Sequence, residues 1–363
     1  MQLGIEAFPR TVEQLEQGLG RLHLGVQIYV SRAGESLANF AVGENRPGEP
    51  LDVETAMLWL SAGKPITAAA ILLAWQRGQL DLDDTIETFI PEFGINGKQD
   101  ITIRHLLTHT APLRMIETGW PDANWDSVIE RISQATPEAD WISGRRAGYH
   151  PQSSWFILGE ILQRISDDSI ANHLAQNIFE PLGMTNVFPT ADVPSSHQVG
   201  VIYERSKGGL GELPWHTGAF RETVSPGSSL RGSAATLGRF YESLLNPPDG
   251  WLTPQTISAM TAIHRRGLFD ETLQHKVDFG LGVIVDSNIY GAATVPYGYG
   301  THCSPRAFGH GGSQSSIGFA DPEFDLVVCV ITNGRCGEPQ HQRRNRAVNS
   351  AIYEDLGLAT ANA

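Results

Sequence analysis

The stretch around which this chain is organised reads Trp59-Leu60-Ser61-Ala62-Gly63-Lys64-Pro65-Ile66-Thr67, an apolar lead-in followed by a serine and a lysine three positions apart. Residues at i and i+3 share one face of a helix, so the Ser61 hydroxyl and the Lys64 amine can meet. Pro65 has no N–H and suits the first turn of a helix, where backbone donors have no intrahelical partner. The sequence therefore predicts that Ser61 lies at a helix N-terminus with Lys64 beside it.

That arrangement suits nucleophilic catalysis. Free N–H groups and the positive end of a helix dipole favour negative charge near the serine oxygen. A serine hydroxyl needs a base, and a lysine can supply one if burial or neighbouring cations lower its pKa. The S-x-x-K pattern occurs once in this chain. Because about one such match is expected by chance, an N-cap serine followed by a solvated lysine is the alternative that the rest of the sequence must exclude.

Composition limits the class of protein. The 363 residues, 41% of them hydrophobic, can bury a large core and suggest two domains or one domain with a sizeable insertion. A formal net charge of −14 disfavours nucleic acid and anionic membranes as partners. The first residues lack the pattern of a signal peptide, and no segment approaches the roughly 20 apolar residues of a membrane span. We therefore expect a soluble cytoplasmic protein, in which the three cysteines serve in packing.

Hydrophobic periodicity gives the order of the elements. Helices are predicted at 11–24, 66–77 and 342–356, a glycine turn leading into a helix at 227–245, and further helices and loops over 123–175. Strands are predicted at 26–30, 37–42, 279–285 and 326–333. Residues 190–225 are rich in Gly, Pro and Ser and are expected to form a long surface excursion that lines a binding site. This order predicts an α+β fold in which both ends of the chain, residues 1–75 and 225–363, build one antiparallel sheet. Residues 76–224 would be a mainly helical insertion.

His105 and His109 lie four residues apart, so zinc must be considered. The first histidine is not followed by glutamate, and no further ligand is signalled downstream. We expect no metal site and no cofactor.

Four stretches, taken together, carry a family resemblance: Ser61-Ala62-Gly63-Lys64-Pro65-Ile66-Thr67, Ile101-Thr102-Ile103-Arg104-His105-Leu106-Leu107-Thr108-His109-Thr110, Tyr149 with Leu158-Gly159 downstream, and Gly309-His310-Gly311-Gly312. With these stretches, nearly the whole chain resembles the serine β-lactamase and penicillin-binding-protein superfamily, in particular the class C β-lactamase-like esterases. The resemblance implies a β-lactamase-like fold, with an antiparallel sheet flanked by helices and a mainly helical inserted domain.

By this resemblance, Ser61 is the nucleophile, Lys64 its base and Tyr149 the residue that carries a proton to the leaving group. The His310-Gly311-Gly312 stretch falls where β-lactamases carry Lys-Thr-Gly on an edge strand, and its glycines would let a substrate approach the backbone. The N–H groups of Ser61 and Ser313 would hold the oxyanion. The structural alternatives are that Tyr149 is a half-buried packing residue and that His310 is a surface residue. The joint occurrence of the motifs favours the functional roles.

The second motif departs from the lactamase pattern. Lactamases have Tyr-x-Asn, whereas Tyr149 is followed by His150-Pro151, which resembles the carboxylesterase branch. Alignment without a gap would put His150 at the proton-carrying position, and a histidine also works as acid and base near neutral pH. We favour Tyr149. Loss of the Asn amide and of the Lys-Thr-Gly lysine puts β-lactamase activity in doubt.

The sequence thus predicts a serine hydrolase that forms an acyl-enzyme on Ser61, as a carboxylesterase or acyltransferase on small esters. One alternative keeps the mechanism on a β-lactam, D-amino-acid peptide or amide. Another, from a different class, is a catalytically silent relative that binds ligands or self-assembles. The expected partner is a small-molecule ester or amide, and the oligomeric state stays open.

Overall fold

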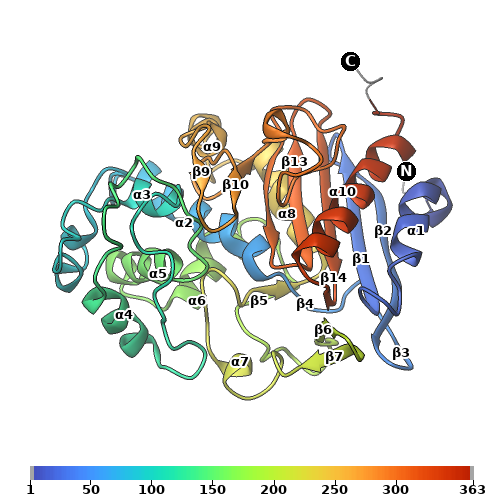
Figure 1. The fold of residues 1–363 in the computed structure, drawn as a ribbon, viewed down its shortest axis with the longest axis horizontal. Coiled ribbons are helices and arrows are strands. Elements are labelled where there is room, and N and C mark those ends of the chain that lie inside the picture. The colour runs from blue at the N-terminus through green and yellow to red at the C-terminus, as the bar shows by residue number, and fades with distance from the viewer. Residues whose placement is uncertain (1–3, 360–363) are drawn as a thin grey trace.

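A seven-stranded antiparallel sheet joins the two ends of the chain (Figure 1). The computed structural model describes residues 4–359. In spatial order the strands are β11 (Ile284–Val285), β12 (Phe308–Gly312), β13 (Ser316–Asp321), β14 (Leu326–Thr332), β1 (Gly25–Arg32), β2 (Glu35–Arg46) and β3 (Glu49–Pro50). The central pair is β1 with β14, where Val26 lies opposite Thr332. The predicted closure of one antiparallel sheet by both ends of the chain is confirmed.

Helices cover both faces of this sheet. Val26, Ile28 and Val30 of β1 pack with α1 (Pro9–Glu16) and α10 (Glu338–Asp355), whereas Tyr29 between them packs with α8 (Ala234–Leu245). Figure 1 shows α10 in front of the sheet and α8 behind it. Because both faces are covered, β14 is buried along its whole length and apolar up to Ile331 rather than alternating.

The helix that begins after the Ser-x-x-Lys stretch lies in the interior. A 3₁₀ turn, η2 (Leu60–Gly63), leads into α2 (Lys64–Gln76), and every residue from Lys64 to Ala74 is buried. A helix that is apolar all round can be stable only when it is enclosed by other elements. The predicted central helix is confirmed, although Ser61 lies in the 3₁₀ turn that precedes its first α-helical residue.

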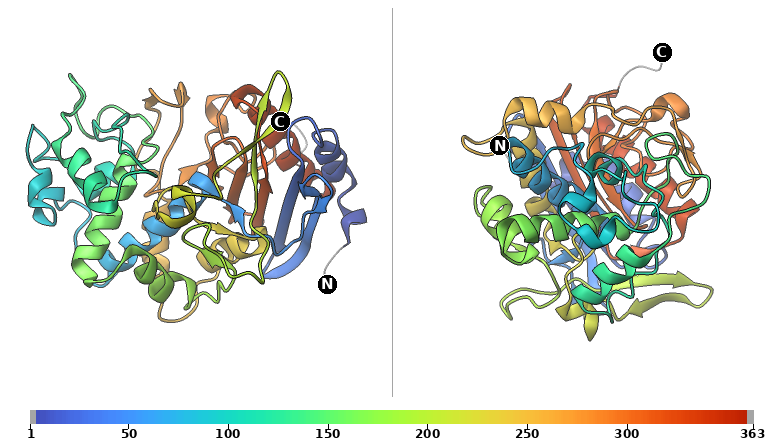
Figure 2. Two further views of the ribbon diagram at one scale, coloured as in Figure 1. Left: turned by 90° about the horizontal axis from the view of Figure 1, so that it is seen from below. Right: turned by 90° about the vertical axis from the view of Figure 1, so that its left-hand side faces the viewer.

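Helical segments form the other half of the molecule, to the left in Figure 1 and in the left view of Figure 2. They are η3 (Ile86–Thr88), η4 (Pro91–Phe93), α3 (Ile103–Leu107), α4 (Trp125–Gln134), α5 (Ser153–Ser166), α6 (Ile170–Leu174) and η5 (Ala175–Phe179). The α5 helix packs directly against α2. This contact joins the helical half to the helix that directly follows Ser61.

The structure differs from the sequence expectations in three places. The helix expected over 11–24 ends at Glu16 in α1. Residues 190–225 contain a hairpin, β6 (Ile202–Ser206) and β7 (Gly209–Leu213), which periodicity did not predict. The strand expected at 279–285 is reduced to β11, because the chain bends at Gly282, whose φ is +76°. A Cβ added there would lie 2.3 Å from Ala68 of α2, so this glycine allows the loop to approach the central helix closely.

The remaining elements are short. They are η1 (Ile5–Ala7), β4 (Met57–Leu58), β5 (Val187–Phe188), α7 (Ala219–Glu222), β8 (Arg231–Gly232), α9 (Pro254–Thr261), β9 (Phe269–Asp270), β10 (His275–Lys276), η6 (Asn288–Tyr290) and β15 (Gly334–Arg335). The strand pairs β4–β8 and β8–β5 fix the segment before Ser61. Between residues 4 and 359, no helix combines the length and apolar character needed to cross a membrane.

Candidate active site

Ser61 is held on a strained turn at the boundary between the sheet and α2. Leu60 has φ = 51°, a left-handed conformation that costs a non-glycine residue about 1–3 kcal/mol and persists only when its surroundings fix it. Those surroundings include the Ser316 hydroxyl, which donates to the Trp59 carbonyl over 2.5 Å. The Trp59 N–H in turn donates to the Leu230 carbonyl over 2.9 Å. The turn leaves Ser61 partly exposed, whereas its neighbours are buried.

Lys64 is fully enclosed, and its Nζ has three oxygen neighbours. It lies 2.9 Å from the Ser61 Oγ, 2.9 Å from the Pro151 carbonyl and 2.8 Å from the Gly227 carbonyl. Burial lowers the pKa of Lys64 well below its ordinary value, and no carboxylate of residues 4–359 forms an ion pair with the amine. A neutral amine has two N–H groups and one lone pair. The two carbonyls can accept only the N–H groups, which leaves the lone pair directed at the Ser61 hydroxyl.

Tyr149 lies on the same side of the site. The Lys64 Nζ is 5.4 Å from the centre of the Tyr149 ring, and the phenol oxygen is enclosed without a well-aligned hydrogen-bond partner among the described residues. Burial raises the pKa of Tyr149, and the neighbouring Ser61 hydroxyl opposes that rise. The phenol is therefore a neutral group that carries a proton beside Ser61.

His150 is placed differently. Its Nδ1 lies 2.5 Å from the Ser154 Oγ, and its Nε2 lies 2.8 Å from the Ala111 carbonyl. The residue is fully buried, and burial lowers its pKa to about 4. Both ring nitrogens are thus engaged in the protein interior, and of the two sequence candidates only Tyr149 reaches the cavity at Ser61.

An ion pair that the sequence analysis did not identify holds Tyr149 in place. The Asp270 carboxylate accepts from the Tyr149 backbone N–H over 3.0 Å and from Arg265 Nη2 over 3.0 Å. Both charged side chains are completely buried, and the Arg265 guanidinium lies 4.1 Å from the centre of the Phe279 ring. Asp270 and Arg265 lie more than a hundred residues from Tyr149 and form no recognisable motif, so the sequence offered no signal for this pair.

We expect Asp270→Asn to lower the free energy of unfolding by about 3–5 kcal/mol, because the substitution leaves a buried guanidinium without its counter-charge. Urea denaturation measures the loss. Asp83→Asn is the matched control, since its Arg–Asp pair with Arg104 is exposed and exposed pairs contribute only about 0–1 kcal/mol. Equal losses in the two variants would contradict the role given to the buried pair.

The two histidines considered for zinc serve local structure. His105 accepts the Thr102 N–H at Nδ1 over 3.2 Å and so completes the cap of α3. The His109 Nδ1 accepts the His150 N–H over 3.0 Å, and its ring lies 4.7 Å from the Tyr149 ring between centroids. The two imidazole rings therefore make separate structural contacts.

His310 faces the site from β12. Its Nδ1 donates to the Gly311 carbonyl over 2.8 Å, which leaves a lone pair on Nε2, and that buried atom has no partner among the described residues. Burial first, and then the nearby Lys64, lower the pKa of His310 to about 3, so the ring is neutral. Because β11 pairs only with Phe308 and Gly309, residues 310–312 form a free strand edge.

The glycines of this stretch also make room for neighbouring protein atoms, and Gly311 lines the polar cavity described below. A Cβ at Gly312 would lie 2.3 Å from the Trp59 carbonyl oxygen, and one at Gly311 would lie 2.3 Å from the Tyr297 ring. Without a side chain at Gly312, β12 can approach the Ser61 turn. The backbone N–H groups of Ser61 and Ser313 donate to no protein acceptor within residues 4–359, so both remain available to an anion.

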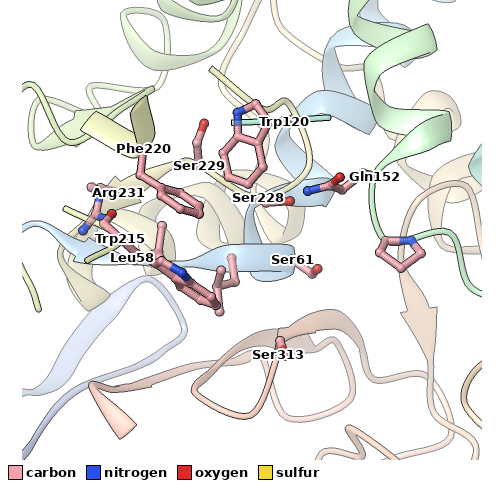
Figure 3. A pocket seen from close by; sticks show the side chains of 12 residues that line it. Leu58, Ser61, Trp120, Gln152, Trp215, Phe220, Ser228, Ser229, Arg231 and Ser313 are labelled. Atoms are coloured by element: carbon pink, nitrogen blue, oxygen red, sulfur yellow. The ribbon is translucent and has the colours of Figure 1, made fainter. Parts of the chain in front are cut away.

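Two cavities meet at Ser61, and Pro151 and Ser313 also line both. The aromatic cavity, of about 350 Å³, is enclosed by Leu58, Leu60, Trp120, Trp215 and Phe220. Figure 3 shows these aromatic side chains gathered on one side of Ser61, with Ser313 across from it. The polar cavity, of about 470 Å³, is lined by Tyr149, His310, Tyr297, Glu338 and Gln342. Trp215 and Phe220 come from the segment 190–225, which the sequence analysis expected to line the binding site.

A serine beside a buried lysine, placed between two cavities on a sheet of this order, defines a class of protein, the serine hydrolases with a β-lactamase-like fold. Comparison with known proteins is consistent with that class. The Beta-lactamase family matches residues 10–352, and the chain belongs to this family.

Among its relatives, the esterase EstB of Burkholderia gladioli is 26% identical over 359 residues, which span 85% of this chain and 86% of EstB. Penicillin-binding protein 4* of Bacillus subtilis is 29% identical over 183 residues, 48% of this chain but only 40% of that protein. The solved structure of EstCE1, described as a hydrolase with promiscuous acyltransferase activity, has a TM-score of 0.82 at 20% identity, and the match covers 96% of this chain and 99% of EstCE1. At that identity the structural match establishes the fold, and the β-lactamase-like fold is confirmed.

Proposed function

We propose that this chain is a serine hydrolase that forms an acyl-enzyme on Ser61, and that it acts as a carboxylesterase or acyltransferase on small esters. One observation carries the proposal. The Lys64 amine is buried, has a lowered pKa and lies 2.9 Å from the Ser61 oxygen, with two backbone carbonyls to accept its N–H groups. A solvated lysine beside an N-cap serine would have none of these features.

The proposed reaction follows from the positions of these groups. The Ser61 oxygen attacks the ester carbonyl while its proton passes to the Lys64 lone pair. The N–H groups of Ser61 and Ser313 stabilise the oxyanion, and one such donor is worth about 3 kcal/mol of barrier. The bond to the leaving oxygen then breaks, Tyr149 donates its phenol proton to that oxygen, and Lys64 returns a proton to Tyr149. Water, or a second alcohol in a transferase reaction, reverses these steps and releases the acyl group.

We propose an ester rather than a lactam substrate because the charged and amide groups that would orient a lactam are missing. Position 310 is a neutral histidine, and the second position after Tyr149 is Pro151 rather than asparagine. The relationship to EstB supports the same choice.

We expect kcat/KM for p-nitrophenyl butyrate to exceed that for nitrocefin by at least about 10²–10³, the rate equivalent of one lost transition-state contact of about 3–4 kcal/mol. Both substrates are followed by absorbance with the same enzyme preparation. An equal kcat/KM for the two substrates would exclude the esterase assignment in favour of a lactamase.

Two further proposals concern the domain boundaries and the cellular location. We propose that residues 1–75 with 225–363 form the sheet domain and that residues 76–224 form an insertion that supplies Trp120, Trp215 and Phe220 to the aromatic cavity. We also propose a cytoplasmic location, which the free thiols of the three cysteines, Cys303, Cys329 and Cys336, support because such thiols persist in a reducing compartment.

A further inference from the structure

The two cavities at Ser61 can be assigned to the two halves of an ester, given the proposed function. A group that protonates the leaving oxygen must lie on the leaving-group side of the scissile bond. Tyr149 lines the polar cavity and does not line the aromatic one. The leaving alcohol therefore occupies the polar cavity, and the acyl group occupies the cavity of Trp120, Trp215 and Phe220.

The polar cavity has an uneven distribution of charge. Among the described residues that line it, Glu338 is the one carboxylate, and there is neither a lysine nor an arginine. His310 is held neutral by burial. The rim carries His275, whose ring nitrogens contact the Lys276 carbonyl and the Thr294 hydroxyl. An anionic leaving group would thus meet a like charge in this cavity and no fixed cation.

Basic side chains on neighbouring segments do not neutralise the negative charge of Glu338 in the polar cavity. Arg346, on the same helix, is turned to the Ala293 carbonyl. The Lys276 amine lies over the Tyr290 ring, 5.9 Å from its centre. Neither residue lines the polar cavity.

The Glu338 carboxylate is held at a defined place. It is the first residue of α10, and its oxygens lie 3.0 Å and 3.2 Å from the Tyr297 hydroxyl, which donates to them. Gln342, one turn along α10, donates to the same carboxylate over 3.2 Å. Burial, and next the charge of Glu338, raise the pKa of Tyr297 well above its ordinary value, so the phenol stays a donor. Although Glu338 is exposed, these hydrogen bonds hold its negative charge against the lining of the polar cavity.

We propose that Glu338 determines the charge of the leaving group, so that the polar cavity favours esters of cationic alcohols over neutral isosteres and rejects esters of anionic alcohols. Attraction or repulsion between partly exposed charges a few ångströms apart changes affinity by about fivefold. The combined discrimination between a cation and an anion is then at least about tenfold.

The test uses three butyrate esters that differ in the alcohol: choline, its neutral isostere 3,3-dimethylbutanol, and 3-hydroxypropanoate. At pH 8, where an ordinary histidine is neutral, and low ionic strength, we expect kcat/KM for the choline ester to exceed that for the anionic ester at least about tenfold. In Glu338→Gln this ratio should fall below about threefold. Raising the salt from about 0.01 M to about 1 M should reduce the ratio of the wild type in the same direction.

Glu130→Gln is the matched control. Glu130 is an exposed residue of α4, and its substitution changes the net charge by the same one unit as Glu338→Gln without altering the cavity. The control should keep the ratio of the wild type. A ratio that falls equally in both variants would assign the selectivity to the overall net charge of −14 and overturn the role of Glu338. Preference of the wild type for the anionic ester would overturn the proposal outright.

A second measurement separates this proposal from the proposed function. The free alcohols choline and 3-hydroxypropanoate are tested for protection of Ser61 against a fluorophosphonate probe. If no ester is turned over, the esterase assignment fails, but stronger protection by choline that is lost in Glu338→Gln would still support the charge selectivity. Equal protection by both alcohols would overturn it.

Discussion

Ser61→Ala is expected to abolish both the covalent adduct with a fluorophosphonate probe and the turnover of short activated esters, with kcat/KM reduced at least about 10⁴-fold. The size of the effect follows from the loss of the nucleophile, without which Lys64, Tyr149 and the oxyanion donors have no group to act on. Intact-protein mass after labelling and p-nitrophenyl butyrate hydrolysis provide the two measurements.

Ser228→Ala is the matched variant, because Ser228 also lines the aromatic cavity but makes no hydrogen bond to Lys64. It should keep the adduct and most of the ester turnover. An adduct of equal yield on Ser61→Ala would remove Ser61 as the nucleophile and return the S-x-x-K stretch to a purely structural role.

The second large effect is expected for Tyr149→Phe, which should retain the fold and lose at least about 10²-fold in kcat, the usual contribution of a general acid or base. The phenol oxygen is enclosed beside Ser61 without a well-aligned hydrogen-bond partner in residues 4–359, so its removal breaks no structural bond there. Thermal unfolding should therefore change little, while the rate falls.

His150→Ala should show the opposite pattern. It removes the contacts to Ser154 and the Ala111 carbonyl in the interior and leaves a cavity, so stability falls, whereas kcat per labelled Ser61 falls by much less than in Tyr149→Phe. The two variants are compared after titration of active sites with the fluorophosphonate probe. A larger loss of kcat in His150→Ala than in Tyr149→Phe would place the proton-carrying group at His150.

Much of the fold could be predicted from the sequence because the periodicity of apolar residues directly reflects which side chains are buried. The apolar run of α2 required an enclosed helix, and the order of the elements indicated one antiparallel sheet built from both ends of the chain. The hairpin β6–β7 escaped prediction because its residues are mostly exposed, and an exposed strand leaves a weak apolar pattern. The strand expected at 279–285 is interrupted at Gly282. The conformation of this glycine depends on its close contact with α2, which is distant in sequence, and not on its sequence neighbours.

Sequence by itself determined which reactive groups are present and that Ser61 and Lys64 share one helical face, because a spacing of three residues fixes their proximity wherever the helix lies. Tertiary structure lowered the pKa of Lys64 by burying its amine, and the carbonyls of Pro151 and Gly227 that contact the amine come from segments 87 and 163 residues away. It also placed Tyr149, and not His150, at the cavity beside Ser61, and it brought Glu338 to the polar cavity. Backbone carbonyls are the same at every residue and burial is a property of the assembled core, so neither leaves a local mark in the sequence.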